Sequence, residues 1–170
     1  VGCVSAACLA DSNHEVTGID IDASKVAMIN EGSCPIVEPG LADLVRDTVA
    51  SGKLRASTCI PDAADVSIVC VGTPSKENGS LDLSHIDHVV GQIGDYLGRL
   101  HSYHVVNIRS TVLPGTVEKH IIPQLEARSR KKAGKDFGVC MNPEFMREGT
   151  SIGDFYNPPF TVIGELDNAS

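Results

Sequence analysis

The sequence predicts an α/β fold built on a doubly wound, mostly parallel sheet. Short runs of apolar and β-branched residues alternate with longer segments whose apolar residues recur every three or four positions. Two of the short runs, at 105–108 and 137–141, end abruptly in polar residues, which is typical of parallel strands that present loops to a ligand. No internal repeat, linker or low-complexity tract divides the chain, so we expect a single domain over residues 1–170.

Composition and charge exclude several classes of function. The 170 residues are 42% hydrophobic, which is enough to bury a core, and the net charge of -8 argues against a nucleic-acid partner. We expect the one basic cluster, residues 128–132, at a solvated helix end. No apolar run approaches the ~20 residues that a membrane span requires, and no signal-peptide pattern opens the sequence. The expected location is therefore the cytoplasm, without a membrane partner.

Cysteines and histidines do not predict a metal site. The cysteines lack any C-x-x-C pair and several lie in apolar stretches, which favours buried, reduced thiols over disulfides or zinc. His85 and His88 lie three apart on a predicted helix, and His101 and His104 flank the next strand, but no third ligand with matching geometry accompanies them. We expect surface or strand-edge histidines. The cysteines are Cys3, Cys8, Cys34, Cys59, Cys70 and Cys140.

The first 26 residues predict the second half of a dinucleotide-binding βαβ unit, that is, a Rossmann-type fold. Residues 1–10 are small, apolar and helix-compatible, a short strand ends in Asp20, and a second helix starts near Ser24. In such units the acid binds the adenosine ribose, a little under ~20 residues after the last glycine of G-x-G-x-x-G. Gly2 fits that spacing, although a surface turn would explain Asp20 equally well.

This alignment implies that the first strand and most of the glycine-rich loop are not part of the sequence. In the usual strand order, 3-2-1-4-5-6, the first strand is central. We therefore expect an interruption between the strand at Val16 and the strand at Val66.

The remaining elements follow the same alternation. The carboxyl ends of parallel strands line the ligand crevice, so Thr73, after a predicted buried strand, should approach a cofactor phosphate or ribose. The further expected elements are a two-proline loop at 33–40, a helix from Leu41, an edge strand at 52–58, a buried strand at 65–71, a helix from Ser84 and a final strand at 161–164.

Two loops at strand ends carry the candidate chemistry. Arg109-Ser110-Thr111 follows one predicted strand, and residues 142–148 follow another. If residues 144–148 form a helical turn, Glu144 and Glu148 share one face. A carboxylate with a raised pKa in a partly dry cleft can orient or activate water. The alternative is an exposed first turn of a helix, where acids are favoured by the dipole.

Four motifs together resemble the nucleotide-sugar 6-dehydrogenases, the UDP-glucose and GDP-mannose dehydrogenase family. They are CPIVEPGL at 34–41, VGTPS at 71–75, RSTVLPGT at 109–116 and NPEFMREG at 142–149. The resemblance spans essentially the whole chain, in order and in register. Residues 35–39, 76–83 and 161–167 are most similar to the GDP-mannose 6-dehydrogenases of alginate-producing bacteria.

The resemblance implies an NAD-dependent, two-step oxidation of a nucleotide-sugar C6 alcohol to a carboxylate, through a cysteine-bound thiohemiacetal and thioester. GDP-mannose is the favoured substrate, with GDP-mannuronate as product in polysaccharide biosynthesis; UDP-glucose and UDP-N-acetylmannosamine are the alternatives. Residues 1–170 would be a truncated NAD-binding domain, inactive alone, because the catalytic Cys and its Lys and Asn partners lie outside it. The parent is expected to be a homodimer or larger.

The resemblance also assigns site residues by position. The expected cofactor contacts are Gly2, Val4, Asp20, Lys25, Thr73, Thr111 and Glu148, of which Asp20 and Lys25 bind the ribose, Gly2 faces the pyrophosphate, and Thr73 and Thr111 line the nicotinamide side. The expected substrate contacts are Glu144, Phe145, Met146 and Arg147. Glu144, which assists water in thioester hydrolysis, and Thr111 are the expected catalytic residues.

Two other functions fit the fold. A non-catalytic nucleotide-binding or regulatory domain would keep the fold without the chemistry. A hydroxyacid-type dehydrogenase would require a catalytic His or Lys after the sixth strand and would leave the residues 142–145 unexplained.

Overall fold

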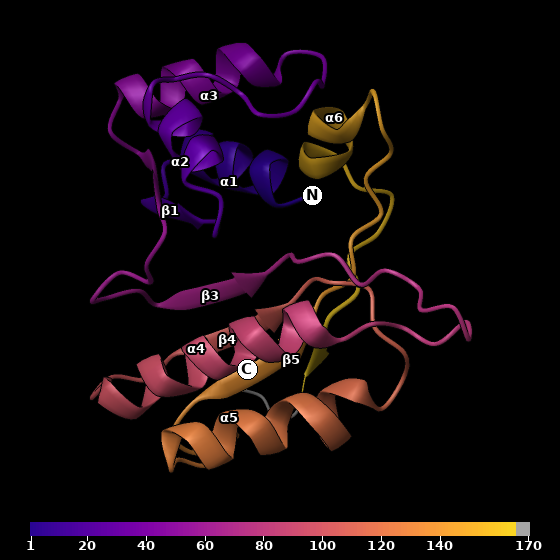
Figure 1. Cartoon of the computed structure of the whole chain (residues 1–170). Coiled ribbons are helices and arrows are strands. Elements are labelled where there is room, and N and C mark those ends of the chain that lie inside the picture. The colour runs from indigo at the N-terminus through magenta and orange to yellow at the C-terminus, as the bar shows by residue number, and fades with distance from the viewer. Residues whose placement is uncertain (166–170) are drawn as a thin grey trace. The chain divides into compact units, whose positions relative to one another are not determined.

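The chain forms two compact units in the computed structural model, which describes residues 1–165 (Figure 1). Unit 1 comprises residues 1–61 and 145–160, and unit 2 comprises residues 62–144 and the described residues from 161 onward. Each unit has its own sheet. The expectation of a single domain over the whole chain stays a prediction.

Unit 1 is built around a short helix of small residues. Val4, Ala7 and Cys8 of the first helix are buried and form a core with Leu41 and Val45. Two strands of the unit pair in parallel, with Val16 opposite Leu54. The elements are α1 (Gly2–Asp11), β1 (Val16–Ile19), α2 (Ala23–Asn30), α3 (Leu41–Ala50), β2 (Leu54–Ser57) and α6 (Ser151–Tyr156).

Unit 2 is a four-stranded sheet in the order β3-β4-β5-β6. Its first three strands are parallel and in common register, with Val66, Val105 and Gly138 aligned, and β6 is antiparallel. The elements are β3 (Val66–Val69), α4 (Ser84–Arg99), β4 (Val105–Ile108), η1 (Val117–Ile121), α5 (Ile122–Ser129), β5 (Gly138–Met141) and β6 (Gly164–Glu165).

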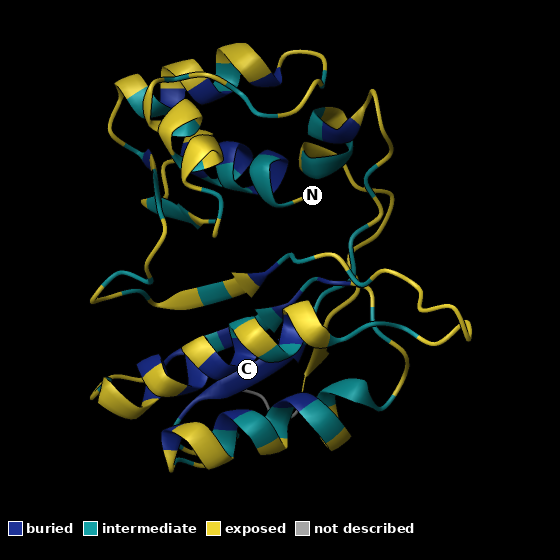
Figure 2. Cartoon of the chain, in the orientation of Figure 1, coloured by how far each residue is buried: buried dark blue, intermediate teal, exposed yellow. Residues whose placement is uncertain are grey.

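The helices of unit 2 pack closely because one of them carries glycines where they meet. In Figure 1, α4 and α5 run side by side across the sheet, and Figure 2 shows buried residues on β4 and β5. A Cβ atom placed on Gly94 would lie 2.5 Å from Cβ of Arg128, and one on Gly98 would lie 3.3 Å from the carbonyl oxygen of Ser129. The missing side chains therefore let the two helix backbones approach.

The predicted fold class is confirmed, and β1 and β3 belong to separate sheets, one in each unit. The prediction that the strand at 65–71 is buried is wrong. β3 is the edge strand of its sheet, so Val66 and Ile68 are 49% and 37% exposed.

The predicted bounds of the last strand are also wrong. Within residues 161–165, pairing covers Gly164–Glu165, and the carbonyl of Val162 instead accepts a hydrogen bond from Nδ2 of Asn142, at 2.9 Å. Residues 166 and 167, which belong to the segment compared with the GDP-mannose 6-dehydrogenases, lie outside the described residues.

His104 is buried, contrary to the expectation of surface or strand-edge histidines. Its Nδ1 donates to the carbonyl of Ala64 at 2.8 Å, which leaves Nε2 to accept from the hydroxyl of Ser67 at 2.9 Å. Its ring meets that of Tyr96 edge to face. Burial lowers the pKa of His104, against smaller raising effects of the Ala64 carbonyl and the Asp65 charge.

We expect His104 to make the stability of unit 2 depend on pH. The pKa of His104 is lower in the folded chain than the unfolded value of about 6.5. The neutral ring therefore contributes fully to folding stability above that pH. This contribution is lost as the pH falls below it, because the unfolded chain binds the proton more readily. Replacing the ring by an amide, His104→Asn, should lower stability at pH 8 and flatten its decline between pH 7 and 5, measured by urea unfolding.

His101→Asn is the matched control, because His101 is exposed just before the same strand. This variant should keep the decline seen in the original chain. An equal decline with pH in His104→Asn would show that His104 does not cause it.

Candidate functional site

In unit 2, the carboxyl ends of β3, β4 and β5 lie at one edge of the sheet, and hydrogen bonds tie their loops together. The main-chain N–H groups of Arg109 and Ser110 both donate to the carbonyl of Val69, at 2.9 and 3.0 Å. The hydroxyl of Ser110 donates to the carbonyl of Val71 at 2.7 Å. The loop after β4 is thereby fixed against the loop after β3.

Thr73 and Thr111, both predicted site residues, meet at this edge. The Thr73 hydroxyl donates to the carbonyl of Thr111 at 2.8 Å. Nδ1 of His85, in the first turn of α4, lies 3.2 Å from the carbonyl of Gly72, which brings the start of that helix to the same loop. The structure therefore supports the predicted proximity of the two threonines, and their roles toward a ligand stay predictions.

Arg109 and Asn142 form a second tie, which the sequence analysis did not predict. Nη1 of Arg109 donates to Oδ1 of Asn142 at 2.8 Å, and the Asn142 N–H donates to the carbonyl of Ile108 at 2.9 Å. Ile108 and Met141 are register partners, so the residues that follow them are neighbours. Alignment of the two strands in the sequence could therefore have predicted that Arg109 and Asn142 lie close together.

The Asn142 tie fixes the start of the loop that carries Glu144, which is partly buried. The pKa of the Cys70 thiol, at the end of β3, is affected by charged residues of both loops. Burial raises the pKa of Cys70, the positive charge of Arg109 lowers it, and the negative charge of Glu144 raises it. A cation and a carboxylate thus lie at the same edge of the sheet.

In unit 1, Asp20 and Lys25 lie together at the end of β1. Nζ of Lys25 is 3.7 Å from Oδ2 of Asp20, and the N–H of Asp22 donates to Oδ1 of Asp20 at 2.9 Å. The two charged side chains are 44% and 51% exposed, so both face solvent. Gly2 is the first residue of α1, whereas the side chain of Val4 is in the core, which leaves only its main chain for a cofactor contact.

Glu38 and Asp154, two carboxylates that the sequence analysis did not single out, hold the segment after the predicted substrate contacts. Glu38 accepts from the N–H groups of Gly149 and Ser151, at 3.1 and 2.9 Å. Asp154 accepts from the N–H, Nε and Nη2 of Arg147, at 2.9, 3.1 and 2.7 Å. These bonds lower the pKa of both carboxyl groups.

The hypothesis of a helical turn over residues 144–148 is wrong. Residues 142–147 have no regular secondary structure, and a turn covers residues 148–150. Side-chain carboxylates instead accept the N–H groups of Arg147, Gly149 and Ser151 in this segment. Glu144 and Glu148 consequently do not share a helix face.

The predicted substrate contacts of unit 1 have different surroundings. Phe145 is 46% exposed and its ring lies 4.8 Å, between centroids, from that of Phe160. Met146 packs against the core of the unit. The guanidinium of Arg147 is bound to Asp154, so in this conformation it supports the loop.

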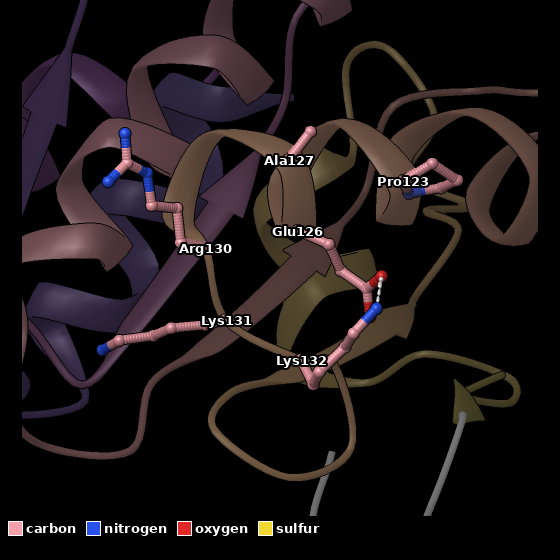
Figure 3. Close-up of a pocket in the computed structure, with 6 residues that line it drawn as sticks. All are labelled: Pro123, Glu126, Ala127, Arg130, Lys131 and Lys132. Atoms are coloured by element: carbon pink, nitrogen blue, oxygen red, sulfur yellow. Dashed lines mark hydrogen bonds and ion pairs between the residues drawn. The ribbon is translucent and has the colours of Figure 1, made fainter.

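An open surface pocket of about 400 Å³ lies along α5 and the residues that follow this helix (Figure 3). Two of its cations have partners within the chain. Lys132 pairs with Glu126 at 2.9 Å, and Nζ of Lys131 donates to the carbonyl of Leu100 at 2.6 Å. The basic cluster is therefore a solvated helix end, as predicted. The pocket is lined by Pro123, Glu126, Ala127, Arg130, Lys131 and Lys132.

The described part of the chain offers neither a metal site nor a membrane-spanning helix. Within residues 1–165, no group of three or more His, Cys, Asp or Glu side chains has an arrangement that could hold a metal ion. None of the helices in that range is both long enough and apolar enough to cross a membrane.

Comparison with known proteins identifies the family. The sequence model of the UDP-glucose/GDP-mannose dehydrogenase family, NAD binding domain, matches residues 1–170. The chain belongs to this family. The predicted family and its NAD cofactor are thereby confirmed, and the matched region comprises both units.

Individual relatives agree. The chain is 54% identical to GDP-mannose 6-dehydrogenase of Azotobacter vinelandii and 40% identical to a UDP-glucose 6-dehydrogenase of Haloferax volcanii, covering 100% and 96% of this chain. A crystal structure of GDP-mannose dehydrogenase from Pseudomonas aeruginosa, a ternary complex, matches 99% of the chain with a TM-score of 0.97 and 50% identity. The chain spans 40%, 38% and 39% of the lengths of these proteins.

We predict that Glu38 holds the main chain at Gly149 and Ser151. Glu38→Ala removes both acceptors, so the two amide hydrogens should exchange with solvent roughly tenfold faster, as expected when charge-assisted hydrogen bonds are lost. Residue-resolved hydrogen exchange measures this. Glu31→Ala, which removes an exposed carboxylate after α2, is the control and should leave both amides unchanged. Unchanged exchange in Glu38→Ala would contradict the assignment.

Proposed function

We propose that the chain is the NAD-binding part of an enzyme that oxidises the C6 alcohol of a nucleotide sugar, GDP-mannose, to the carboxylate. The observation that carries this proposal is 54% identity over the whole chain to a GDP-mannose 6-dehydrogenase, against 40% to a UDP-glucose enzyme. The chain spans only about two fifths of these relatives. The activity is therefore proposed for a longer protein, which we also propose to be homo-oligomeric and cytoplasmic.

For unit 1, we propose that Asp20 and Lys25 bind the adenosine ribose of NAD. Oδ1 of Asp20 already accepts from the N–H of Asp22, while Oδ2 is 3.7 Å from Lys25, too far for a direct hydrogen bond. Oδ2 is thus able to accept from ribose hydroxyls, which are donors. Gly2, at the start of α1, has no side chain to obstruct a phosphate near the helix N-terminus. The residues present therefore fit the cofactor.

For unit 2, we propose that Thr73 and Thr111 line the nicotinamide side, and that Glu144 orients water for hydrolysis of a thioester. NAD, when bound, accepts the hydride in each of the two oxidation steps. Thr111 is exposed at the sheet edge, and its carbonyl is fixed by the Thr73 hydroxyl. Glu144 lies two residues after Asn142, whose side chain accepts a hydrogen bond from Arg109, and this bond fixes the start of the loop.

The remaining assignments rest on segment 145–151. We propose main-chain contacts of Phe145 and Met146 with the sugar nucleotide, a substrate contact for Arg147 and a cofactor contact for Glu148. The support for a main-chain role is that Glu38 and Asp154 fix the backbone of this segment through its N–H groups. A substrate contact by the Arg147 guanidinium would require it to leave or share Asp154.

The substrate is tested with the whole protein that contains this chain. We expect it to produce two NADH per GDP-mannose, one for each proposed hydride transfer, and to use UDP-glucose and UDP-N-acetylmannosamine much less efficiently. NADH absorbance under matched conditions measures this. The 170 residues alone should produce none, because the proposed mechanism requires a catalytic Cys that we expect elsewhere in the whole protein. A preference for a UDP sugar would change the substrate, and no oxidation of any nucleotide sugar would favour the non-catalytic domain.

We also expect Glu144→Gln in the whole protein to slow thioester hydrolysis more than the first hydride transfer. The amide keeps the size of the side chain but removes the negative charge that orients water. A loss of the order of 100-fold in hydrolysis is expected for a positioned acid–base group. Rapid mixing with quenched-flow analysis separates the steps, and equal slowing of both would reject this role.

A further inference from the structure

Two cysteine thiols of unit 1 lie next to each other although they are 31 positions apart in sequence. Sγ of Cys3 is 4.0 Å from Sγ of Cys34, and both residues are partly buried against the core of the unit. Cys3 is in the first turn of α1, and Cys34 is in the loop that leads to α3. The expectation of buried, reduced thiols did not include a contact between two of them.

The geometry favours a bond between the two sulfur atoms. A disulfide requires them at about 2.05 Å, so a combined movement of about 2 Å by two side chains would close it. Cys34 belongs to a loop, and Cys3 is on the outer turn of a helix whose N-terminus has no side-chain cap. Both positions can therefore adjust without moving β1.

We propose that Cys3 and Cys34 form a dithiol site that reacts with low-molecular-weight disulfides, such as oxidised glutathione, and closes to an intramolecular disulfide. Neither cysteine has a role proposed toward NAD or the nucleotide sugar, although Cys3 lies between the expected cofactor contacts Gly2 and Val4, and the thiol chemistry does not depend on those roles. The oxidant is reduced to two thiols as the two cysteines are oxidised.

The order of steps follows from the surroundings of the sulfur atoms. Burial, followed by the neighbouring Cys34, raises the pKa of the Cys3 thiol to about 12. Cys34 therefore attacks the glutathione disulfide first: it loses its thiol proton, forms a mixed disulfide and releases one glutathione thiolate. Cys3 then loses its proton and attacks the Cys34 sulfur. This forms the Cys3–Cys34 bond and expels the second glutathione thiolate, and both released thiolates take up protons.

The bond would constrain the part of unit 1 that carries the ribose-binding pair. The closed loop contains β1 and α2, and with them Asp20 and Lys25. Four residues beyond Cys34, Glu38 holds Gly149 and Ser151. Oxidation would thus tie the first turn of α1 to the loop that fixes segment 149–151.

The experiment is a peptide map of the oxidised chain. The purified, reduced chain is incubated with oxidised glutathione, its remaining thiols are alkylated, and it is digested with trypsin without reduction. Cleavage after Lys25 and Arg46 places Cys3 and Cys34 in separate peptides, 1–25 and 26–46. We expect these peptides as the main cross-linked species, lighter by two hydrogen atoms than their sum, and separated again by a reductant.

Variants identify the bond, because Cys8 shares the first peptide with Cys3. Cys8→Ser should keep the cross-link, since Cys8 is fully buried, and Cys3→Ser should abolish it and leave a mixed glutathione disulfide on Cys34. A cross-link that persists in Cys3→Ser, or a Cys34 that stays glutathionylated or alkylatable in the original chain, would overturn the proposal. Exposed Cys59 serves as an internal reference for simple glutathionylation.

Discussion

Parallel pairing of strands is the constraint on which the candidate site depends. Parallel neighbours cannot be joined by a tight hairpin, so each connection crosses the sheet and each strand ends at the same edge. In unit 2 this brings Thr73, Thr111 and Asn142 together from three distant parts of the sequence. The close approach of α4 and α5, which requires Gly94, covers the sheet while leaving that edge to the loops. The polar groups meet there because the strands run in one direction.

The two units hold their loops by different means. In unit 2, main-chain bonds from Arg109 and Ser110 to Val69 continue the sheet beyond its last regular pair, and side-chain bonds of Ser110, Thr73 and Arg109 add to them. In unit 1, residues 145–150 form neither strand nor helix, and the carboxylates of Glu38 and Asp154 accept N–H groups of this segment. The conformation of the unit 1 segment therefore depends on the ionisation of a few acids, whereas that of the unit 2 loops depends on the sheet.

Sequence analysis predicted whatever follows from local pattern and spacing. The short strand before Asp20 and the polar residues after β3 and β4 follow from apolar runs and their terminating residues. Lys25 was assigned to the same ribose-binding pair only by the family resemblance. The exposure of β3 did not, because it depends on which strand forms the sheet edge. The role of Glu38, which lies in the motif at 34–41, was not predicted, because its hydrogen-bond partners lie 111 and 113 positions away in the sequence. The pair of Cys3 and Cys34 is likewise a tertiary contact that spacing does not reveal.

The hydrogen bonds that each carboxylate accepts distinguish those that support the fold from those that are free to bind a ligand. Asp22 accepts from Ser24 at the start of α2, and Asp82 accepts from the N–H of Ser84 at the start of α4. Those bonds lower the pKa of both groups, so they stay ionised and occupied near neutral pH. Asp20 differs, because its one bond from Asp22 uses Oδ1 and its contact with Lys25 is longer than a hydrogen bond. A strand-end carboxylate with one oxygen committed and the other facing solvent beside a cation is suited to a neutral donor such as a ribose hydroxyl, because the first bond fixes its orientation and the second oxygen accepts the ligand.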